Sequence, residues 1–428
     1  MIEINKLIKG NEKELLSSII ERRVNDNKEI VQVVGEIITK VRNDGDKELR
    51  NFTEKFDGVI IQDFLVSNKE IEEAFENADK EFIDALNESK ENIENYHKMQ
   101  KKYGYMYTKD LGIYMGQRII PLERVGVYVP GGTAAYPSSV LMNVIPAKVA
   151  GVKEIIMVTP PDKNGKVNSN ILVAAKIAEV DKIYKIGGAQ AIAALCYGTE
   201  SIKSVSKVVG PGNAYVAEAK KQVFGSIGID MVAGPSEILI IADEKANPRF
   251  IAADLMSQAE HDVKASSILI TTSLDIANKV KEELEIQVKE LERKEIIKKS
   301  LKDYGKIIIT DNIDSAIELA NLIAPEHLEI LTVNPMEKLN KIVNAASVFI
   351  GEYTPEPVGD YFGGTNHVLP TCGTAIFSSP LSVDDFVKKS SYLYYSEEAI
   401  LRDGNKIMKI ANEEGLTAHE NAVKVRLK

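Results

Sequence analysis

Short apolar runs alternate from Arg124 onward with segments whose apolar residues recur at helical spacing. Uninterrupted apolar runs predict strands buried on both faces, and their alternation with helices is typical of parallel sheets covered on both sides. The runs form two series, at 125–129, 154–159, 182–186 and 205–209 and then at 237–242, 267–272, 306–310 and 328–331. The helical patterns lie at 170–178, 191–195, 214–223, 250–261, 275–299 and 313–322. The sequence therefore predicts an α/β fold of two similar parallel-sheet units that meet near 234–236, with a ligand crevice between them.

The two ends of the chain follow other patterns. Three apolar stripes between residues 12 and 99 predict helices, and residues 103–120 alternate around a turn at 110–112, which fits a hairpin. The tail from Ser382 is expected to be helical, and its last helix begins at Thr417 with a capping box completed by Glu420. A helix that stops at a glycine and restarts after a loop suits an arm that docks on another subunit.

These patterns divide the chain into four expected parts. An N-terminal helical region with a hairpin (1–120) is expected to pack partly on the second α/β domain. The first α/β domain spans 121–236 and the second spans 237–380. Residues 381–428 form a C-terminal helical arm that we expect to be exchanged in a dimer.

Composition restricts the class of protein. A chain of 428 residues with 44% hydrophobic and 27% charged residues is typical of a globular protein with more than one domain. A formal charge of -10 without a lysine-rich block argues against a nucleic-acid binder. The sequence shows no apolar run long enough to cross a bilayer and no signal peptide, so we expect no membrane association and a cytoplasmic protein. Two distant cysteines predict neither a disulfide scaffold nor a thiolate metal site, so a metal would need nitrogen and oxygen ligands.

Glycine-bearing turns follow three strands of the first series, at 130–132, 187–190 and 210–213. The turn at 130–132 brings backbone close to whatever binds there. The other two open helices and expose N-terminal amides, which favours phosphate or dinucleotide binding, although plain tight turns fit the spacing equally well. Gly210 and Gly212 match the first two positions of a dinucleotide fingerprint, but Tyr215 stands where the third glycine belongs. Asp230 follows Gly210 at the spacing of a ribose-binding acid.

Candidate metal ligands lie in the helix expected at 250–261. Gln258 and His261 are three residues apart, so both side chains can reach one point beside the same helix face. An amide oxygen and an imidazole nitrogen are plausible ligands for a divalent metal. This stretch taken alone nevertheless favours a solvated polar face.

Further candidates lie later in the chain. Glu326 and His327 precede a strand and suit an acid/base pair, although a neutral structural histidine is equally compatible. Residues 351–373 lack a regular period, and Asp360 and His367 within them are candidates for metal and substrate contact. Glu414 and His419 flank a tight turn and could point the same way, whereas His97 is expected to be structural or exposed.

Eight motifs, taken together and in order, resemble the histidinol dehydrogenase family over nearly the whole chain. They are ERVGVYVPGG (123–132), GGAQAIAAL (187–195), VVGPGNAYVAEAK (208–220), AGPSE (233–237), SQAEHD (257–262), APEHLE (324–329), EPVGDYFGGTNHVLPT (356–371) and EGLTAHENAV (414–423). The resemblance implies two incomplete Rossmann-like domains and a homodimer.

The resemblance also implies the site residues. One zinc ion per subunit would be held by Gln258, His261, Asp360 and His419, with His419 donated by the neighbouring subunit. NAD would contact Tyr128, Gln190 and Asn213, although the missing third glycine leaves the phosphate contacts open. Substrate would contact Ser236, Gln258, His261, His327, Asp360, Glu414 and His419, with His367 close by.

The implied reaction is the oxidation of L-histidinol to L-histidine through L-histidinaldehyde, with two NAD and one water. His327 would be the base for both oxidations, and Glu326 would activate the water that hydrates the aldehyde. Zinc would grip the imidazole and amino groups of the substrate and so orient its carbon toward the nicotinamide.

Three other functions use some of the same residues. A metallohydrolase with zinc-bound hydroxide, acting on a small polar substrate, could use the same four ligands without the glycine turns. An aldehyde dehydrogenase with a thiol nucleophile would use Cys372, since Cys196 lies in an apolar helix. The last alternative is a non-catalytic sensor or transport protein with two α/β lobes.

Overall fold

Two parallel sheets form the body of the protein in a computed structural model that describes residues 2–7, 16, 17, 19, 28–110, 112–131 and 135–427. The first sheet contains β4 (Arg124–Tyr128), β5 (Glu154–Thr159), β6 (Lys182–Lys185), β7 (Lys207–Val209) and β8 (Gly228–Ile229), in the order β6-β5-β4-β7-β8. The second contains β9 (Glu237–Ala242), β10 (Ser266–Thr271), β11 (Lys306–Ile309), β12 (His327–Leu331) and β13 (Ser347–Ile350), in the order β11-β10-β9-β12-β13. In chain order both sheets run 3-2-1-4-5, so the two Rossmann-like units predicted from the sequence are confirmed.

Helices cover both faces of each sheet. The first unit carries α5 (Pro137–Ala150), α6 (Ser169–Ile177), α7 (Gly188–Tyr197) and α8 (Ala214–Val223). The second carries α9 (Pro248–Ala259), α10 (Leu274–Gln287), α11 (Lys294–Asp303), α12 (Ile313–Ile323) and the short α13 (Glu356–Tyr361). Successive residues of a strand enter different cores, as Ile155 and Ile156 of β5 do. This alternation explains why the strands have no polar face.

The N-terminal helices pack on the first unit. Helix α2 (Lys28–Asp57) contacts α7 and α8, α3 (Asn68–Glu76) contacts α6, and α4 (Lys80–Lys98) contacts α5. Strand β1 (Glu3–Lys6) pairs with β11 at the edge of the second sheet, and Leu16 and Ile19 pack into the core of that unit. Helix α4 also contacts the second unit, since Ser89 donates to the carbonyl of Tyr361 and Asn92 to that of Phe362. Of the first stripe, at 15–20, residues 16, 17 and 19 are described and helical, and the others lie outside the described residues. The boundaries at 120, 236 and 380 stay a prediction.

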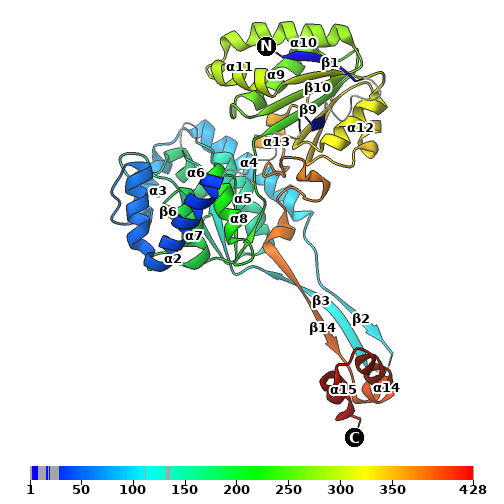
Figure 1. Cartoon of the computed structure of the whole chain (residues 1–428). Helices are drawn as coiled ribbons and strands as arrows, with labels where there is room; N and C mark the ends of the chain where they lie inside the picture. Colours follow the sequence, from blue (N-terminus) through cyan, green and yellow to red (C-terminus); the bar gives the residue numbers. More distant parts are fainter. Residues whose placement is uncertain are drawn as a thin grey trace.

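A three-stranded antiparallel sheet projects from the body and carries two helices at its far end (Figure 1). The expected hairpin is present as β2 (Tyr105–Lys109) and β3 (Ile113–Pro121). The tail helices are α14 (Glu397–Glu413) and α15 (Thr417–Lys424). None of the helices described here is both long enough and apolar enough to span a bilayer.

Three local predictions in the outer parts were wrong. After a single 3-10 turn at Val383–Phe386, the tail continues as β14 (Val387–Tyr394) rather than as a helix, because it pairs with β3, a partner far away in sequence. The helix predicted over 275–299 is interrupted, since a tight turn at Val288–Glu290 separates α10 from α11. The capping box of the last helix is absent, because Leu416 occupies the N-cap position and Thr417 is already helical.

Asp46 fixes the N-terminal helices to the first unit. It is 6% exposed, and its carboxylate accepts hydrogen bonds from the hydroxyl and the backbone N–H of Ser201. Its own backbone N–H donates to Glu200 Oε2 at 2.8 Å. The preceding Gly45 has φ +52°, where α2 kinks and its backbone meets this loop.

We expect Asp46→Ala to lower the free energy of unfolding by about 1 to 2 kcal/mol, because it removes two hydrogen bonds that the buried Asp46 carboxylate accepts from Ser201. Urea denaturation followed by circular dichroism measures the change. Asp44→Ala, at an exposed position of the same helix, is the matched control. Equal stabilities of the two variants would contradict this docking role.

Candidate active site

The candidate site lies at the amino end of the second sheet. His327 begins β12 and pairs in register with Ile238 of β9, so Glu326 and Glu237 lie side by side at that edge. Helix α9 follows β9 and runs antiparallel to it. Its carboxyl end, which carries Gln258, therefore lies at the same amino edge of the sheet. The helix ends at Ala259, two residues earlier than predicted.

His261 consequently lies in the turn after α9, where its backbone N–H bonds Gln258 O at 3.2 Å. It lines a cavity of about 450 Å³ between the two units. Ser138 at the start of α5 and Tyr361 of α13 also line this cavity. Burial lowers the pKa of the His261 imidazole, which keeps it neutral and able to bind a metal or a proton.

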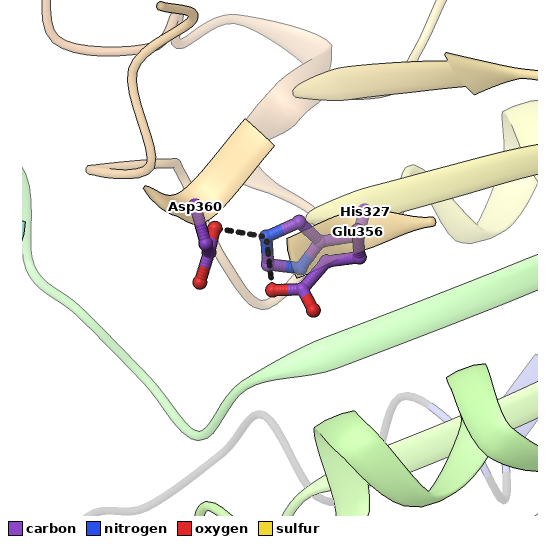
Figure 2. A group of neighbouring side chains, drawn as sticks. All are labelled: His327, Glu356 and Asp360. Carbon is purple, nitrogen blue, oxygen red and sulfur yellow. Dashed lines mark ion pairs between the residues drawn. The ribbon is translucent and has the colours of Figure 1, made fainter. Parts of the chain in front are cut away.

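The environment of His327 determines which of its nitrogens carries the proton. Nδ1 lies 2.9 Å from the carbonyl oxygen of Glu237, which can only accept, so Nδ1 carries the hydrogen. Nε2 is therefore unprotonated. It lies 3.8 Å from both Glu356 Oε1 and Asp360 Oδ1 (Figure 2) and has no hydrogen-bond partner among the described residues. Burial lowers the pKa of His327 to about 3, so the ring is neutral at neutral pH.

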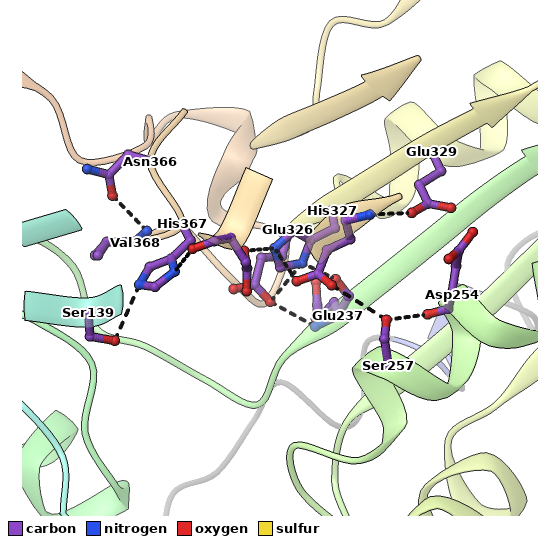
Figure 3. A network of polar contacts seen from close by, with 12 residues as sticks. Ser139, Glu237, Asp254, Ser257, Glu326, His327, Glu329, Asn366, His367 and Val368 are labelled. Carbon is purple, nitrogen blue, oxygen red and sulfur yellow. Dashed lines mark hydrogen bonds and ion pairs between the residues drawn. The ribbon is translucent and has the colours of Figure 1, made fainter. Parts of the chain in front are cut away.

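Acidic side chains surround this ring. Burial raises the pKa of Glu356 to about 10 and that of Asp360 to about 6, and their proximity raises that of Glu356 further. Burial also raises the pKa of Glu326 well above its usual value, although the N–H of Glu237 opposes this effect by donating to Glu326 Oε2 at 2.8 Å. A polar network continues behind them (Figure 3).

That network includes a second buried acid on β12. Glu329 lies two residues after His327, so both side chains project from the same face of the strand. Its Oε1 accepts the backbone N–H of Glu356 at 2.9 Å, which ties the start of α13 to the strand. Burial, together with the neighbouring Asp254, raises the pKa of Glu329 well above its usual value.

Glu356 is the functional candidate that sequence reasoning missed. It is four residues before Asp360, which is the spacing of side chains on one helix face. The segment 351–373 was interpreted as lacking a regular period, so the six-residue helix that creates this spacing was not recognised. The signal was present in the motif EPVGD.

His367 bridges the two units. Its Nδ1 donates to the carbonyl of Asp360 at 3.1 Å, and its Nε2 accepts from Ser139 Oγ of α5 at 3.3 Å. Burial lowers its pKa to about 4. Because both ring nitrogens have partners within the chain, His367 is placed to hold Asp360, and its contact with substrate stays a prediction.

The side chains fit a metal of the zinc type. Gln258 is 1% exposed, and its Oε1 has no hydrogen-bond partner among the described residues, which is costly unless a cation or a hydrogen-bond donor binds there. Amide, imidazole and carboxylate groups form a suitable donor set. The cluster of potential ligands found within this chain is His327, Glu356 and Asp360, which shares only Asp360 with the predicted set.

The remaining predicted site residues differ in position. Ser236 is half-buried directly before β9, beside the candidate site. Glu414 and His419 are exposed on the projecting arm (Figure 1), so within one chain they do not join the other predicted ligands. The buried His97 is structural, because Nδ1 bonds Gln100 Oε1 at 2.8 Å and Nε2 lies 3.3 Å from Asn366 Nδ2.

The three predicted cofactor residues lie together at the carboxyl edge of the first sheet. Tyr128 ends β4, and its hydroxyl accepts the N–H of Gly188 at 3.1 Å. Burial raises the Tyr128 pKa to about 12. Gln190 of α7 is buried, and its Oε1 has no partner among the described residues. Asn213 is exposed and caps α8 by accepting from Tyr215 and Val216 N–H at 3.0 and 3.1 Å.

The interpretation of Asp230 as a ribose-binding acid was wrong. Its side chain is 1% exposed and forms an ion pair with Lys220. Its Oδ2 also accepts the backbone N–H of Gly210 at 2.8 Å. The carboxylate is thus occupied behind the turn. Gly132, part of the first glycine turn, lies outside the described residues.

Comparison with known proteins assigns the family. The family model described as histidinol dehydrogenase matches residues 20–427. The chain belongs to the histidinol dehydrogenase family. Membership confirms the resemblance and places the chain among the oxidoreductases of histidine biosynthesis.

Individual members of the histidinol dehydrogenase family are similar over nearly their full length. The histidinol dehydrogenase of Clostridium acetobutylicum is 60% identical over 411 residues, covering 96% of this chain and 95% of the relative. That of Listeria monocytogenes is 52% identical over 422 residues, covering 98% and 99%. The crystal structure of histidinol dehydrogenase from Elizabethkingia anophelis matches with a TM-score of 0.94 at 39% identity, covering 100% of this chain and 98% of that one.

The raised pKa of Glu356 predicts a pH-dependent stability. In the fold this carboxyl keeps its proton up to about pH 10, whereas the unfolded chain releases it near pH 4.5. Its stabilising contribution is complete below the lower value and is lost as pH rises toward the upper one. We therefore expect the metal-free wild type to lose stability relative to Glu356→Gln between about pH 5.5 and 8.5, by at most about 1.4 kcal/mol per pH unit.

Chemical denaturation of both proteins at the two pH values measures this difference. The exposed Glu352→Gln, on the same loop, is the matched control for removing a carboxyl. A stability difference between wild type and Glu356→Gln that stays constant or reverses with pH would contradict a protonated Glu356.

Proposed function

We propose that this protein oxidises L-histidinol to L-histidine through L-histidinaldehyde, in two NAD-dependent steps in the cytoplasm. The observation that carries the proposal is the unprotonated Nε2 of His327. It faces Glu356 and Asp360 in a buried site, within a chain that belongs to the family throughout its length.

His327 is the proposed base of both oxidations. Each oxidation removes a proton from oxygen, so the base must present a free nitrogen at neutral pH. The hydrogen bond from Nδ1 to Glu237 O directs the proton-accepting nitrogen to the site. The Asp360 carboxylate, 3.8 Å from Nε2, would stabilise the imidazolium that forms when Nε2 takes the proton.

Glu326 is the proposed base for hydration of the aldehyde. Its burial makes the ionised carboxylate a stronger base than an exposed one, which favours proton removal from water. The N–H of Glu237 holds one carboxylate oxygen in place. Glu237 thus orients both proposed bases, with its carbonyl on His327 and its N–H on Glu326.

Gln258, His261 and Asp360 would hold the zinc ion, together with His419 of a second copy of the chain. Bound there, zinc would supply a positive charge that fixes the imidazole and amino groups of the substrate. The unpartnered oxygen of Gln258 and the neutral ring of His261 support these roles. Ser236 and Glu414 would contribute substrate contacts.

NAD would bind across the glycine turns and accept the hydride. Tyr128, Gln190 and Asn213 lie on three turns at one edge of the first sheet, where Rossmann-like units bind dinucleotides. In the second unit, the turn after the first strand, β9, runs from Asp243 to Asn247 and contains no glycine, unlike the turn after β4 in the first unit. This difference supports one cofactor site per chain.

The arm supports a homodimer. It exposes large apolar side chains that a second copy would cover, namely Tyr105, Met106, Tyr107, Leu393, Tyr394, Leu401, Ile410, Leu416 and Val425. Within one chain, Glu414 and His419 lie at its far end (Figure 1). An exchanged arm would carry both residues to the site of the partner.

We expect two NADH to form per L-histidinol consumed, measured by absorbance with limiting substrate. Metal chelation should abolish the reaction, whereas replacing both cysteines by serine should leave most activity. Cys196 is buried with a raised thiol pKa, which disfavours a thiolate nucleophile. An absorbance trace that stays flat with metal present would contradict the proposal and favour a metallohydrolase. Loss of activity in the cysteine variant would favour a thiol mechanism.

A heterodimer tests the arm exchange. Gln258→Leu and His419→Ala should each inactivate the homodimer. A heterodimer of the two variants can be isolated with two different affinity tags. If the arms are exchanged, the body of the His419→Ala subunit receives the unchanged arm of the Gln258→Leu subunit, so this one site carries neither substitution. We expect the heterodimer to recover about half of the wild-type activity, because one of its two sites is complete. If His419 served its own chain, the heterodimer would be inactive.

A further inference from the structure

A buried ion pair lies directly behind the turn that carries Asn213. The side chains of Lys220 and Asp230 are 2% and 1% exposed, so neither charge reaches solvent. Removing two charges from water is costly, and replacement by apolar groups often leaves stability unchanged. Burial of the pair is therefore weak evidence that it stabilises the fold, and the other hydrogen bonds that its atoms form become informative.

Both members of the pair bind the same residue. Lys220 Nζ donates to the carbonyl of Gly210 at 2.9 Å, and Asp230 Oδ2 accepts the N–H of Gly210 at 2.8 Å. The second oxygen of Asp230 accepts the N–H of Met231 at 2.6 Å. The two backbone polar groups of Gly210 are therefore each fixed by a charged partner, and such hydrogen bonds are stronger than neutral ones.

Gly210 itself is in a conformation that needs this support. Its φ is +110°, a region that only glycine adopts easily. A Cβ there would lie 2.1 Å from the carbonyl oxygen of Tyr128, so the turn passes directly over the end of β4. Gly210 thus sets the distance between two proposed cofactor residues, Tyr128 and Asn213.

The pair also connects the turn to the helix that follows it. Lys220 lies in α8, seven residues after the N-cap Asn213, which is about two turns and therefore the same face. Asp230 follows β8, the neighbour of β7 in the sheet. The residue after β7, the last turn of α8 and the residue after β8 are consequently held at one point.

We propose that Lys220 and Asp230 are positioning residues that preset the 210–213 turn for NAD, so that cofactor affinity depends on a charged pair that does not touch the cofactor. The inference rests on the proposed placement of NAD at the glycine turns. Asp230 then retains an effect on the cofactor, exerted through the backbone of Gly210 and without a contact to the ribose.

The test measures NADH binding directly, by fluorescence titration of the full-length protein without histidinol. In Lys220→Met we expect the Kd for NADH to rise at least about tenfold, the order found when partners that hold a ligand-binding group are removed. The KM for NAD should rise while kcat at saturating NAD stays close to wild type. Glu154→Gln is the matched control, because its ion pair with Arg124 lies at the opposite edge of the same sheet.

A double variant separates positioning from stability. Lys220→Met with Asp230→Leu leaves no uncompensated buried charge and should recover most of the unfolding free energy lost in Lys220→Met. The double variant should still bind NADH weakly, because neither the N–H nor the carbonyl of Gly210 regains its charged partner. If either folded variant binds NADH with the wild-type Kd, the pair is only structural and the inference fails.

The wild type provides a test that no folding defect can obscure. Hydrogen exchange should show the Gly210 amide protected before NADH is added, because Asp230 already binds it. An amide that exchanges freely until NADH binds would overturn the inference. If the wild type binds no NADH, the proposed function fails, and if Asn213→Ala binds it normally, the placement of the cofactor fails.

Discussion

The hydrogen bond from His327 to the carbonyl of Glu237 is the interaction on which the chemistry of this site depends. It joins the first residues of two neighbouring parallel strands, so its geometry is as rigid as the register of the sheet. It also decides the tautomer of the ring, because a carbonyl can only accept. The free nitrogen therefore faces the acids of α13. A histidine in a loop would have no comparable constraint on which nitrogen it presents.

The acidic side chains around His327 are unfavourable for folding, because their charged forms lose contact with water. Glu326, Glu329 and Glu356 are buried, Asp360 is half-buried beside them, and desolvation raises the pKa of each carboxyl. Buried oxygens on Gln258 and Glu356, which find no hydrogen-bond partner in the part of the chain that the structure describes, add to this cost. A bound cation would relieve both effects. Such a concentration of perturbed groups is typical of a functional site and would be difficult to maintain as a purely structural core.

The proposed functional residues of the two Rossmann-like units lie at opposite edges of their sheets. In the first unit the proposed cofactor residues follow the carboxyl ends of the strands, whereas in the second the acid/base residues lie at the amino ends. His367 of the second unit connects them, since it holds Asp360 and accepts from Ser139 at the start of α5. Similar sheets with the same strand order can therefore contribute different parts of one reaction.

The sequence by itself determined the fold class, the two parallel sheets and the glycine turns, and it singled out His327 and Asp360, which lie together in the structure. These features depend on local patterns, since an apolar run or a helical spacing is visible within a few residues. Tertiary structure decided the features that depend on distant partners. Pairing with β3 makes residues 387–394 a strand, a six-residue helix brings Glu356 to Asp360, and Lys220 engages Asp230 behind the 210–213 turn. No local period encodes these contacts, because each depends on where the rest of the chain places a second surface.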